Sequence, residues 1–241
     1  LESVKEVNSV KSLICITSDK CYENNNSTKG FKETDKLGGE DPYSGSKASA
    51  EIIIRSYQES FFDGKKCGVA SARAGNVIGG GDWSENRLIP DTINSIIKDK
   101  KIFIRNPSFN RPWQHVLEPL YGYLMLGEKV YTNPKKYSGP WNFGTTKNTA
   151  TDVLTIVRAI IKFWGKGKLK FKTNQKYYEQ TNLQLDITKA VKILRWKPKY
   201  SIIKSVQTTV EWYKKVLAEK TSIEQITERQ IKEYMNEPKS N

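Results

Sequence analysis

The chain has 241 residues, 37% of them hydrophobic, and its 40 basic against 26 acidic side chains give a formal net charge of +14. This length can form one large domain or two smaller ones, and no apolar run approaches the roughly 18 residues of a membrane span, so we expect no membrane partner. The charge suggests nucleic-acid binding as an alternative. Because the lysines are dispersed and no zinc-finger or RRM signature accompanies them, we expect no nucleic-acid partner either.

Strands and helices alternate along the sequence, which predicts βαβ units and a largely parallel sheet. Strands are predicted at residues 13–17, 68–73, 101–105, 141–144 and 168–172. Helices are predicted at residues 43–62, 89–98, 117–130, 151–165, 187–194 and 201–219, followed by a helical or frayed tail after residue 221. The pair Asp41-Pro42 is the start signal of the first of these helices.

The cysteines and the single histidine limit the chemistry that the chain can perform. Cys15, Cys21 and Cys67 are odd in number and lack metal-ligand spacing, which indicates a reduced, cytoplasmic protein, with Cys15 and Cys67 as small buried residues. The first six residues also lack the basic and apolar segments of a signal peptide. Since His115 is the only histidine, we expect no histidine metal site or histidine relay, and we interpret His115 as a packing or hydrogen-bonding residue.

No glycine-rich dinucleotide motif occurs at the expected place. A nucleotide-binding α/β fold usually begins with a strand that runs into G-x-G-x-x-G, and nothing before Leu13 resembles this motif. The segment GGGDW at residues 79–83 follows a later strand without opening a helix. We interpret it as a loop that needs unusual backbone angles or the close approach of a ligand.

Two short patterns carry candidate chemistry. Asp19 and Lys20 follow the strand at residues 13–17, where open α/β sheets keep their active residues, and they form either an ion pair that caps a loop or a proton-handling couple. Tyr43 and Lys47 lie four residues apart, which places both side chains on one face of a helix. The ammonium favours the phenolate form of the tyrosine, although surface Tyr–Lys neighbours without a function are common.

The order strand, Ser-Asp-Lys, loop, Tyr-x-x-x-Lys, helix resembles the extended short-chain dehydrogenase/reductases that modify nucleotide sugars. Within them it is most similar to the 4,6-dehydratases of CDP-glucose. The dTDP-glucose dehydratases have Thr-Asp-Glu in place of Ser-Asp-Lys, and the 4-epimerases have neither the acid nor the lysine. The stretches that carry the resemblance are TSDKCYEN, DPYSGSKASAE, SARAGNVIGGGDWSENRLIPD, RPWQHVLEPLYGYL, WNFG and LDITKAVKILRWKP.

The resemblance implies NAD-dependent 4,6-dehydration of CDP-glucose for deoxysugar and lipopolysaccharide synthesis. The sugar is oxidised at carbon 4, water is lost across carbons 5 and 6, and hydride returns to carbon 6. Tyr43 would take the hydroxyl proton at carbon 4, with Lys47 holding it phenolate-like. Asp19 would protonate the leaving hydroxyl at carbon 6, Lys20 would act as the base or a positioning group at carbon 5, and Ser18 would hydrogen-bond a sugar hydroxyl.

The resemblance also implies the binding residues. Asn76 matches a position near the substrate phosphates, and Arg87 and Arg111 can meet a diphosphate with a rigid fork of donors. Arg73 is either a further residue of the site or half of a structural ion pair at the strand end. The residues expected to contact NAD are Thr17, Tyr43 and Lys47.

We expect the C-terminal portion of a Rossmann-like parallel sheet with helices on both faces, and a smaller α+β subdomain. Residues 1–78 with 112–147 are expected to form a partial NAD-binding domain. Residues 79–111 with 148–220 are expected to bind the nucleotide sugar, and residues 221–241 to form a tail. Another nucleotide-sugar epimerase or dehydratase of the same family, or an inactive fragment with only a binding role, is the alternative.

Members of this family begin with roughly a hundred further residues, which include the glycine-rich turn that receives the NAD pyrophosphate. Without them, residues 13–17 are expected to present an open sheet edge. The isolated chain is then expected to self-associate and to bind no NAD, whereas the full-length protein is expected to be a homodimer.

Overall fold

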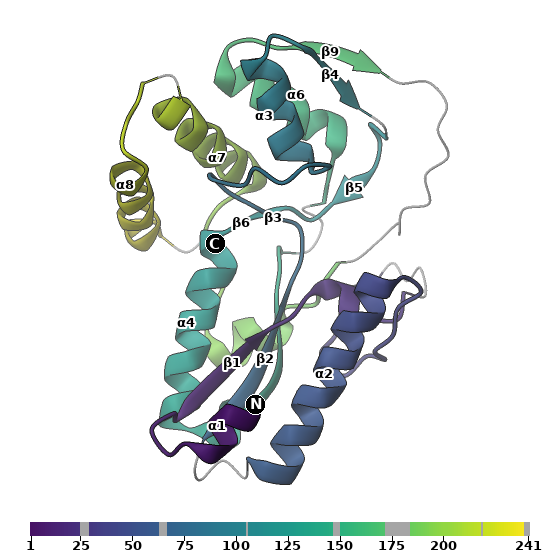
Figure 1. The fold of residues 1–241 in the computed structure, drawn as a ribbon, viewed down its shortest axis with the longest axis vertical. Coiled ribbons are helices and arrows are strands. Elements are labelled where there is room, and N and C mark those ends of the chain that lie inside the picture. Colours follow the sequence, from purple (N-terminus) through teal and green to yellow (C-terminus); the bar gives the residue numbers. More distant parts are fainter. Residues whose placement is uncertain are drawn as a thin grey trace. The chain divides into compact units, whose positions relative to one another are not determined.

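The computed structural model divides the chain into two compact units (Figure 1). The first unit comprises residues 1–75, 118–147 and 182–197, and the second comprises residues 76–117, 148–181 and 198–241. Residues 76–78 and 112–117 thus lie in the second unit and residues 182–197 in the first, while the binding functions expected of the two domains remain predictions. The structure describes residues 1–24, 29–62, 67–104, 106–146, 150–171, 184–217 and 219–238.

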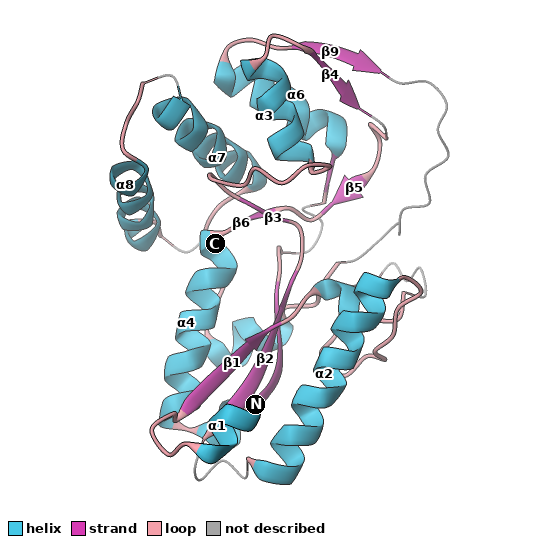
Figure 2. Ribbon diagram, viewed as in Figure 1, coloured by secondary structure: helices cyan, strands magenta, loops and turns pink. Residues whose placement is uncertain are grey.

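A three-stranded parallel sheet forms the centre of the first unit (Figure 2). Its order is β1-β2-β7, with Ile16 of β1 opposite Ala72 of β2. The strands differ by at most two residues from the predicted ends, and within the described residues β1 pairs only with β2, so β1 forms the expected open edge. The bounds are β1, Ser12–Ile16; β2, Gly68–Ala74; and β7, Gly139–Phe143.

Helices cover both faces of this sheet, as predicted (Figure 1). Helix α2 (Pro42–Phe61) packs through Ile54 against Val69 of β2. Helix α4 (Leu117–Thr132) packs through Leu126 against the alanines of β2 that point the other way. The small side chains of β2 are buried on both faces, which lets both helices approach the central strand closely.

Helix α2 begins where its capping residues place it. The Asp41 carboxylate accepts hydrogen bonds from the backbone N–H groups of Tyr43 at 3.0 Å and Ser44 at 3.1 Å, and Pro42 occupies the first helical position. These bonds satisfy donors that the first turn of a helix leaves without partners. The first catalytic candidate on this helix, Tyr43, is therefore held in the capped first turn.

Short helical elements complete the described part of the first unit. A single 3₁₀ turn (Asp19–Cys21) follows β1, and the short helices are α1 (Glu2–Glu6) and α5 (Pro134–Tyr137). The ordinary helix predicted at residues 187–194 is instead a π-helical turn over Ala190–Leu194, which ends at Arg195 with φ +60°. The hydrophobic pattern predicted a helix here but could not distinguish the wider π turn.

Helices dominate the second unit, and its strands are short. The helices are α3 (Leu88–Ile97), α6 (Val153–Trp164), α7 (Ile202–Leu217) and α8 (Ile223–Asn236). The strands are β3 (Val77–Ile78), β4 (Lys101–Ile104), β5 (Asn110–Arg111), β6 (Gln114–His115), β8 (Thr151–Asp152) and β9 (Lys168–Phe171). Pairs β3–β6 and β4–β9 are parallel and β5–β8 is antiparallel. The predicted strand ends at residues 105 and 172 lie outside the described residues.

The segment expected to be a tail contains helix α8, which packs on α7. Gln230 Nε2 donates to the Thr208 carbonyl at 2.8 Å, and Trp212 Nε1 donates to Thr227 Oγ1 at 3.0 Å. In the described residues, no helix is both long and apolar enough to span a bilayer.

The GGGDW loop needs its glycines for packing and backbone conformation. A Cβ on Gly80 would overlap the ring of Trp212, and Gly81 has φ +82°. Of the two expected alternatives, the unusual backbone angle is present at Gly81, and Gly80 is approached closely by a side chain of the same unit rather than by a ligand.

Candidate functional site

The Ser18-Asp19-Lys20 segment forms a compact turn directly after β1. The Thr17 N–H donates to the Ala72 carbonyl at 2.9 Å, so the sheet pairing continues to the first residue after the strand. Ser18 Oγ donates to Asp19 Oδ1 at 3.0 Å and accepts from the Lys20 N–H at 3.2 Å. The Asp19 side chain is held inside the protein by this turn, and the residue is only 4% exposed.

Tyr43 and Lys47 lie on the first two turns of α2 and face each other. The Lys47 Nζ is 5.7 Å from the centre of the Tyr43 ring, and the tyrosine is 55% exposed. This geometry agrees with the expected shared helix face. It leaves the phenol accessible to a bound molecule while a cation lies within reach of its ring.

The turn and the helix are neighbours in the first unit. Helix α2 packs against the turn Asp19–Cys21. Hydrogen bonds from Ser44 lower the pKa of Asp41, and the nearby Lys20 ammonium adds a smaller effect in the same direction. The structure therefore brings all five predicted catalytic residues to the carboxyl end of β1 and the amino end of α2; their joint action on a substrate remains a prediction.

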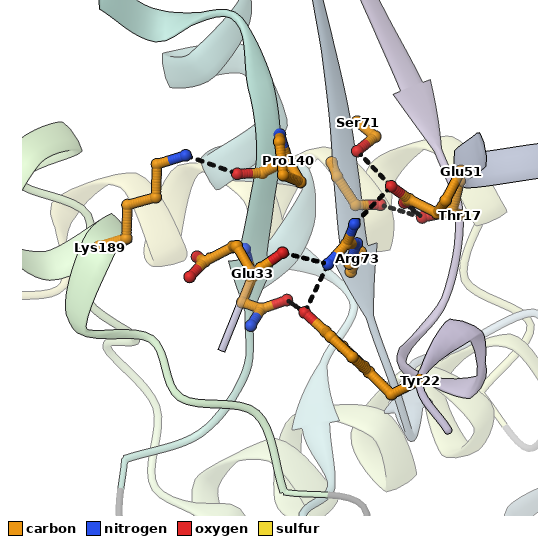
Figure 3. A network of polar contacts seen from close by, with 10 residues as sticks. Thr17, Tyr22, Glu33, Glu51, Ser71, Arg73, Pro140 and Lys189 are labelled. Carbon is orange, nitrogen blue, oxygen red and sulfur yellow. Dashed lines mark hydrogen bonds and ion pairs between the residues drawn. The ribbon is translucent and has the colours of Figure 1, made fainter. Parts of the chain in front are cut away.

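A buried ion pair lies one further helical turn along α2 (Figure 3). The Arg73 guanidinium donates to Glu51 Oε2 at 2.7 Å, and both side chains are only 3% exposed. Ser71 Oγ donates to the same carboxylate oxygen at 2.8 Å, while Thr17 Oγ1 donates to Glu51 Oε1. Glu51 thus joins α2 to β2 and to the residue that follows β1.

The network continues from Arg73 to β7 (Figure 3). A second Arg73 nitrogen donates to the Tyr22 hydroxyl at 2.7 Å and to the Glu33 carbonyl at 3.2 Å. The Tyr22 hydroxyl donates to Asn142 Oδ1 at 2.7 Å, and the Asn142 N–H donates to Glu33 Oε1 at 3.0 Å. Lys189 Nζ donates to the carbonyl of Pro140, two residues before Asn142 on β7, at 2.7 Å.

The electrostatics of this network follow from burial and pairing. Burial opposes ionisation of Glu51, but the hydrogen bond and charge of Arg73, with the bonds from Thr17 and Ser71, outweigh it and lower the Glu51 pKa. Burial raises the pKa of Glu33 and lowers that of Lys189. Glu51 is therefore ionised in the folded protein, as a buried salt bridge to Arg73 requires.

Most of this network could not be predicted from the sequence. Of the two alternatives for Arg73, a residue of the site or half of a structural ion pair, the ion pair is present. Glu51 lies four residues after Lys47 and eight after Tyr43, so its helical spacing could have placed it on the same face. No comparable local signal points to Tyr22 or Asn142, because their contact joins residues 120 positions apart.

The three residues expected to bind substrate all lie in the second unit. Asn76 has φ +50°, a conformation that asparagine tolerates, and its carbonyl accepts from the Gln114 N–H at 3.1 Å. Arg87 is exposed and lies 3.4 Å from Asp82 Oδ2. Arg111 lies in β5, with its guanidinium 5.5 Å from the centre of the Phe109 ring. Their role in substrate binding remains a prediction.

Thr17 was expected to contact NAD. The Thr17 hydroxyl proton is directed to Glu51, which limits any contact with NAD to the remaining surface of the side chain and the backbone.

Cys67 is buried as expected, whereas Cys15 is only partly buried and Cys21 is fully buried. Burial raises the pKa of the Cys21 thiol to about 12. The described residues contain no cluster of three or more histidine, cysteine or acidic side chains that could hold a metal ion.

His115 is packed as expected for a structural residue. The residue is 2% exposed, its ring meets Tyr200 edge-on, and its Nδ1 accepts from the Leu117 N–H at 3.3 Å. Burial lowers its pKa to about 4, so the imidazole is neutral at physiological pH.

The chain resembles nucleotide-sugar enzymes in sequence and in fold. The sequence profile described as GDP-mannose 4,6 dehydratase matches residues 1–209. The CDP-glucose 4,6-dehydratase of Salmonella typhimurium is 39% identical over 98% of this chain and 67% of its own length.

Solved structures of nucleotide-sugar enzymes share the fold of this chain. The dTDP-glucose 4,6-dehydratase of Bacillus anthracis, solved in complex with NAD, superimposes with a TM-score of 0.73 at 26% identity, over 89% of this chain and 65% of the other. The UDP-glucose 4-epimerase of Thermotoga maritima, solved with UDP-glucose, has a TM-score of 0.74 at 22% identity, over 90% and 67%. The chain thus spans about two thirds of the length of these relatives.

Proposed function

Because the chain belongs to the GDP-mannose 4,6 dehydratase family, we propose that it carries the catalytic residues of an NAD-dependent enzyme that converts CDP-glucose to CDP-4-dehydro-6-deoxyglucose. The observation that carries the proposal is the buried Asp19, held by Ser18 at the end of β1, beside the helix that bears Tyr43 and Lys47. The identity of 39% to a CDP-glucose 4,6-dehydratase supports the substrate.

The residues at the start of α2 fit the nicotinamide side of an NAD molecule. Tyr43 is open to a ligand, and the partly exposed ammonium of Lys47 offers hydrogen-bond donors to ribose hydroxyls. When bound there, NAD supplies the hydride acceptor for the oxidation and the hydride donor for the final reduction. The relative solved with NAD supports this cofactor.

Tyr43 and Lys47 serve the oxidation at carbon 4. The tyrosine accepts the proton of the carbon 4 hydroxyl as the base of this step, and the lysine cation beside its ring stabilises negative charge on the tyrosine oxygen. Glu51 and Arg73 fix the helix that carries both residues to the sheet, because their ion pair joins α2 to β2.

Asp19 and Lys20 serve the loss of water. Once carbon 4 is a ketone, the proton on carbon 5 becomes acidic, and Lys20 acts as the base or orients the group that removes this proton. Hydroxide is a poor leaving group, so the carbon 6 hydroxyl must be protonated as it departs. Asp19 in its acid form donates that proton, and Ser18 orients the carboxyl group.

Substrate capture and assembly complete the proposal. Asn76, Arg87 and Arg111 of the second unit bind the nucleotide diphosphate, for which arginine offers paired donors. Exposed apolar side chains on α2, at Ile52 and Phe61, support a homodimer of the full-length protein. The free cysteines support a cytoplasmic enzyme. Its product serves deoxysugar and lipopolysaccharide synthesis, as the resemblance implies.

The test compares nucleotide sugars and separates the half-reactions in the full-length protein. We expect CDP-glucose to be preferred over dTDP-glucose, UDP-glucose and GDP-mannose, with loss of one water detected by mass spectrometry. With substrate deuterated at carbon 4, the product should carry the deuterium at carbon 6. In Asp19→Asn, water loss should slow by roughly 100- to 10,000-fold while oxidation at carbon 4 persists as reduced NAD in a single turnover.

Asp35→Asn is the matched control, because Asp35 is an exposed carboxylate that accepts the Lys32 N–H at 2.8 Å outside the site. It should react like the parent. An Asp19→Asn variant that dehydrates at the parent rate would assign the acid role to another group. Inversion at carbon 4 without water loss would favour the epimerase alternative.

A further inference from the structure

Gly75 lies at the end of β2, where the chain passes directly against the Asp19 carboxyl group. A Cβ built on Gly75 would overlap this carboxyl group, and its three nearest atoms all belong to Asp19, with Oδ1 at 2.7 Å. The φ angle of Gly75 lies outside the left-handed region, so the backbone conformation does not demand glycine here. Position 75 requires glycine because the Asp19 carboxyl group approaches its backbone closely.

The positions of the two residues follow from the sheet register. Ile16 of β1 lies opposite Ala72 of β2, and the pairing continues through the Thr17 N–H. The two parallel strands therefore end side by side, and the Asp19 turn folds over the residue that follows β2. Ser18 Oγ donates to Oδ1 of the carboxyl group. Because Gly75 has no side chain, the space beside its backbone is free for this carboxyl group.

We propose that Gly75 is a positioning residue that fixes the Asp19 carboxyl group for the dehydration half of the reaction. The proposal rests on the proposed function, in which Asp19 protonates the departing hydroxyl. A methyl group at position 75 displaces this carboxyl group. Tyr43 and Lys47 belong to α2, whose contacts with the sheet run through Glu51 and Ile54, so the oxidation half keeps its geometry.

The kinetic test uses Gly75→Ala in the full-length protein with CDP-glucose and NAD. We expect oxidation at carbon 4 to stay within about threefold of the parent while water loss falls by roughly 100-fold or more, so that reduced NAD and the 4-keto sugar accumulate. A general loss of structure would slow both half-reactions together. The matched control is Gly127→Ala on α4, where the nearest atom to an added Cβ is Ile14 Cγ1 at 3.7 Å, and it should react like the parent.

A second measurement tests the packing without any substrate. Gly75→Ala should lower the melting temperature, because the new methyl group and the carboxyl group compete for the same volume. Adding Asp19→Ala removes the carboxyl group and should restore most of that loss, while dehydration stays impaired. The control double variant Asp35→Ala with Gly75→Ala should remain as destabilised as Gly75→Ala alone.

Either arm can overturn the inference. Dehydration at the parent rate in Gly75→Ala, or an equal loss of both half-reactions, would show that Gly75 does not position the acid selectively. A melting temperature that Asp19→Ala fails to restore would show that the two residues do not share the volume. If the parent protein dehydrates no nucleotide sugar, the proposed function fails, and the melting arm still decides whether Gly75 sets the place of Asp19.

Discussion

The two units bury their polar groups in different ways. The interior of the first unit contains a full ion pair, Glu51 with Arg73, at the end of its sheet where the candidate catalytic residues lie. In the second unit, the ammonium of Lys199 is buried against the carbonyls of Tyr234 and Met235 at the end of α8. The other buried polar side chains described there are uncharged at neutral pH: Thr92, Gln114, His115, Ser205, Thr208, Thr209 and Gln230.

The buried ion pair of the first unit positions a helix that carries candidate catalytic residues, whereas the buried polar groups of the second unit serve helix packing. A buried ion pair costs desolvation of both charges and is weak evidence for stability, but it favours the arrangement of its elements that keeps the two charges paired. In the first unit this arrangement sets α2, with Tyr43 and Lys47, against the strand ends. In the second unit, Lys199 and Gln230 instead satisfy backbone carbonyls of packed helices, which stabilises the helices without fixing a reactive group.

The largest effect is expected from breaking the ion pair of the first unit. Arg73→Leu leaves the Glu51 carboxylate buried without its partner, and the first unit should lose about 3–5 kcal/mol of stability. Hydrogen exchange measures this loss of stability when β2 peptides are compared with α7 peptides of the same protein. Protection in α7 should stay close to that of the parent.

The double variant Glu51→Leu with Arg73→Leu sharpens this prediction. It removes both charges, so it should recover much of the stability that Arg73→Leu loses. It should not recover activity, because the ion pair that positions α2 on β2 is gone while only the apolar packing of Ile54 on Val69 remains. Recovery of full activity would show that the pair has no positioning role.

Glu33 in the first unit and His115 in the second should make contributions of opposite sign to the acid response of their units. Burial lowers the pKa of His115 from 6.5 to about 4, so the unfolded chain binds a proton between these values before the folded one does. The second unit should therefore lose stability as the pH falls, on the order of 2–3 kcal/mol by about pH 4. In the first unit, burial raises the pKa of Glu33, so the folded state takes up its proton first and gains stability as the pH falls.

Hydrogen exchange of each unit, corrected for the intrinsic exchange rate at each pH, measures this contrast. His115→Asn keeps an acceptor for the Leu117 N–H but removes the titration, and it should flatten the pH dependence of the second unit only. Glu33→Gln should flatten that of the first. An unchanged slope in either variant would assign the pH dependence to another group.

A smaller effect is expected at the end of α8. Lys199→Met keeps the length of the side chain but removes the donors to the carbonyls of Tyr234 and Met235, which lie 2.8 and 3.1 Å from Nζ. Loss of these charge-assisted bonds should cost about 1–3 kcal/mol, seen as faster exchange in α8. Lys232→Met, which alters an exposed lysine on the same helix, is the matched control and should change little.

The smallest effect is expected for an exposed ion pair between α7 and α8. Arg229 lies 2.6 Å from Glu211, as close as the buried pair, but its side chain is 43% exposed and that of Glu211 is 39% exposed. Arg229→Ala should therefore cost no more than about 1 kcal/mol by chemical denaturation. A cost equal to that of Arg73→Leu would contradict the view that burial, rather than distance, separates the two pairs.

The sequence by itself determined the features that depend on neighbours along the chain. Asp41 and Pro42 set the start of α2, and the spacing of Tyr43 and Lys47 set their shared face, because caps and helical periodicity act within about four residues. The strands of the first unit could be placed within two residues, since buried apolar and small residues mark them. The π turn at residues 190–194 could not be distinguished, because its hydrophobic pattern is that of an ordinary helix.

Only the tertiary structure decided which distant residues meet. Glu51 and Arg73 lie 22 positions apart, and Asp19 and Gly75 belong to turns after different strands. Their contacts depend on the parallel register of β1 on β2, with Ile16 opposite Ala72, which brings the two strand ends together. A shift of this register would separate these pairs without changing a single local pattern, because local rules do not fix how strands align.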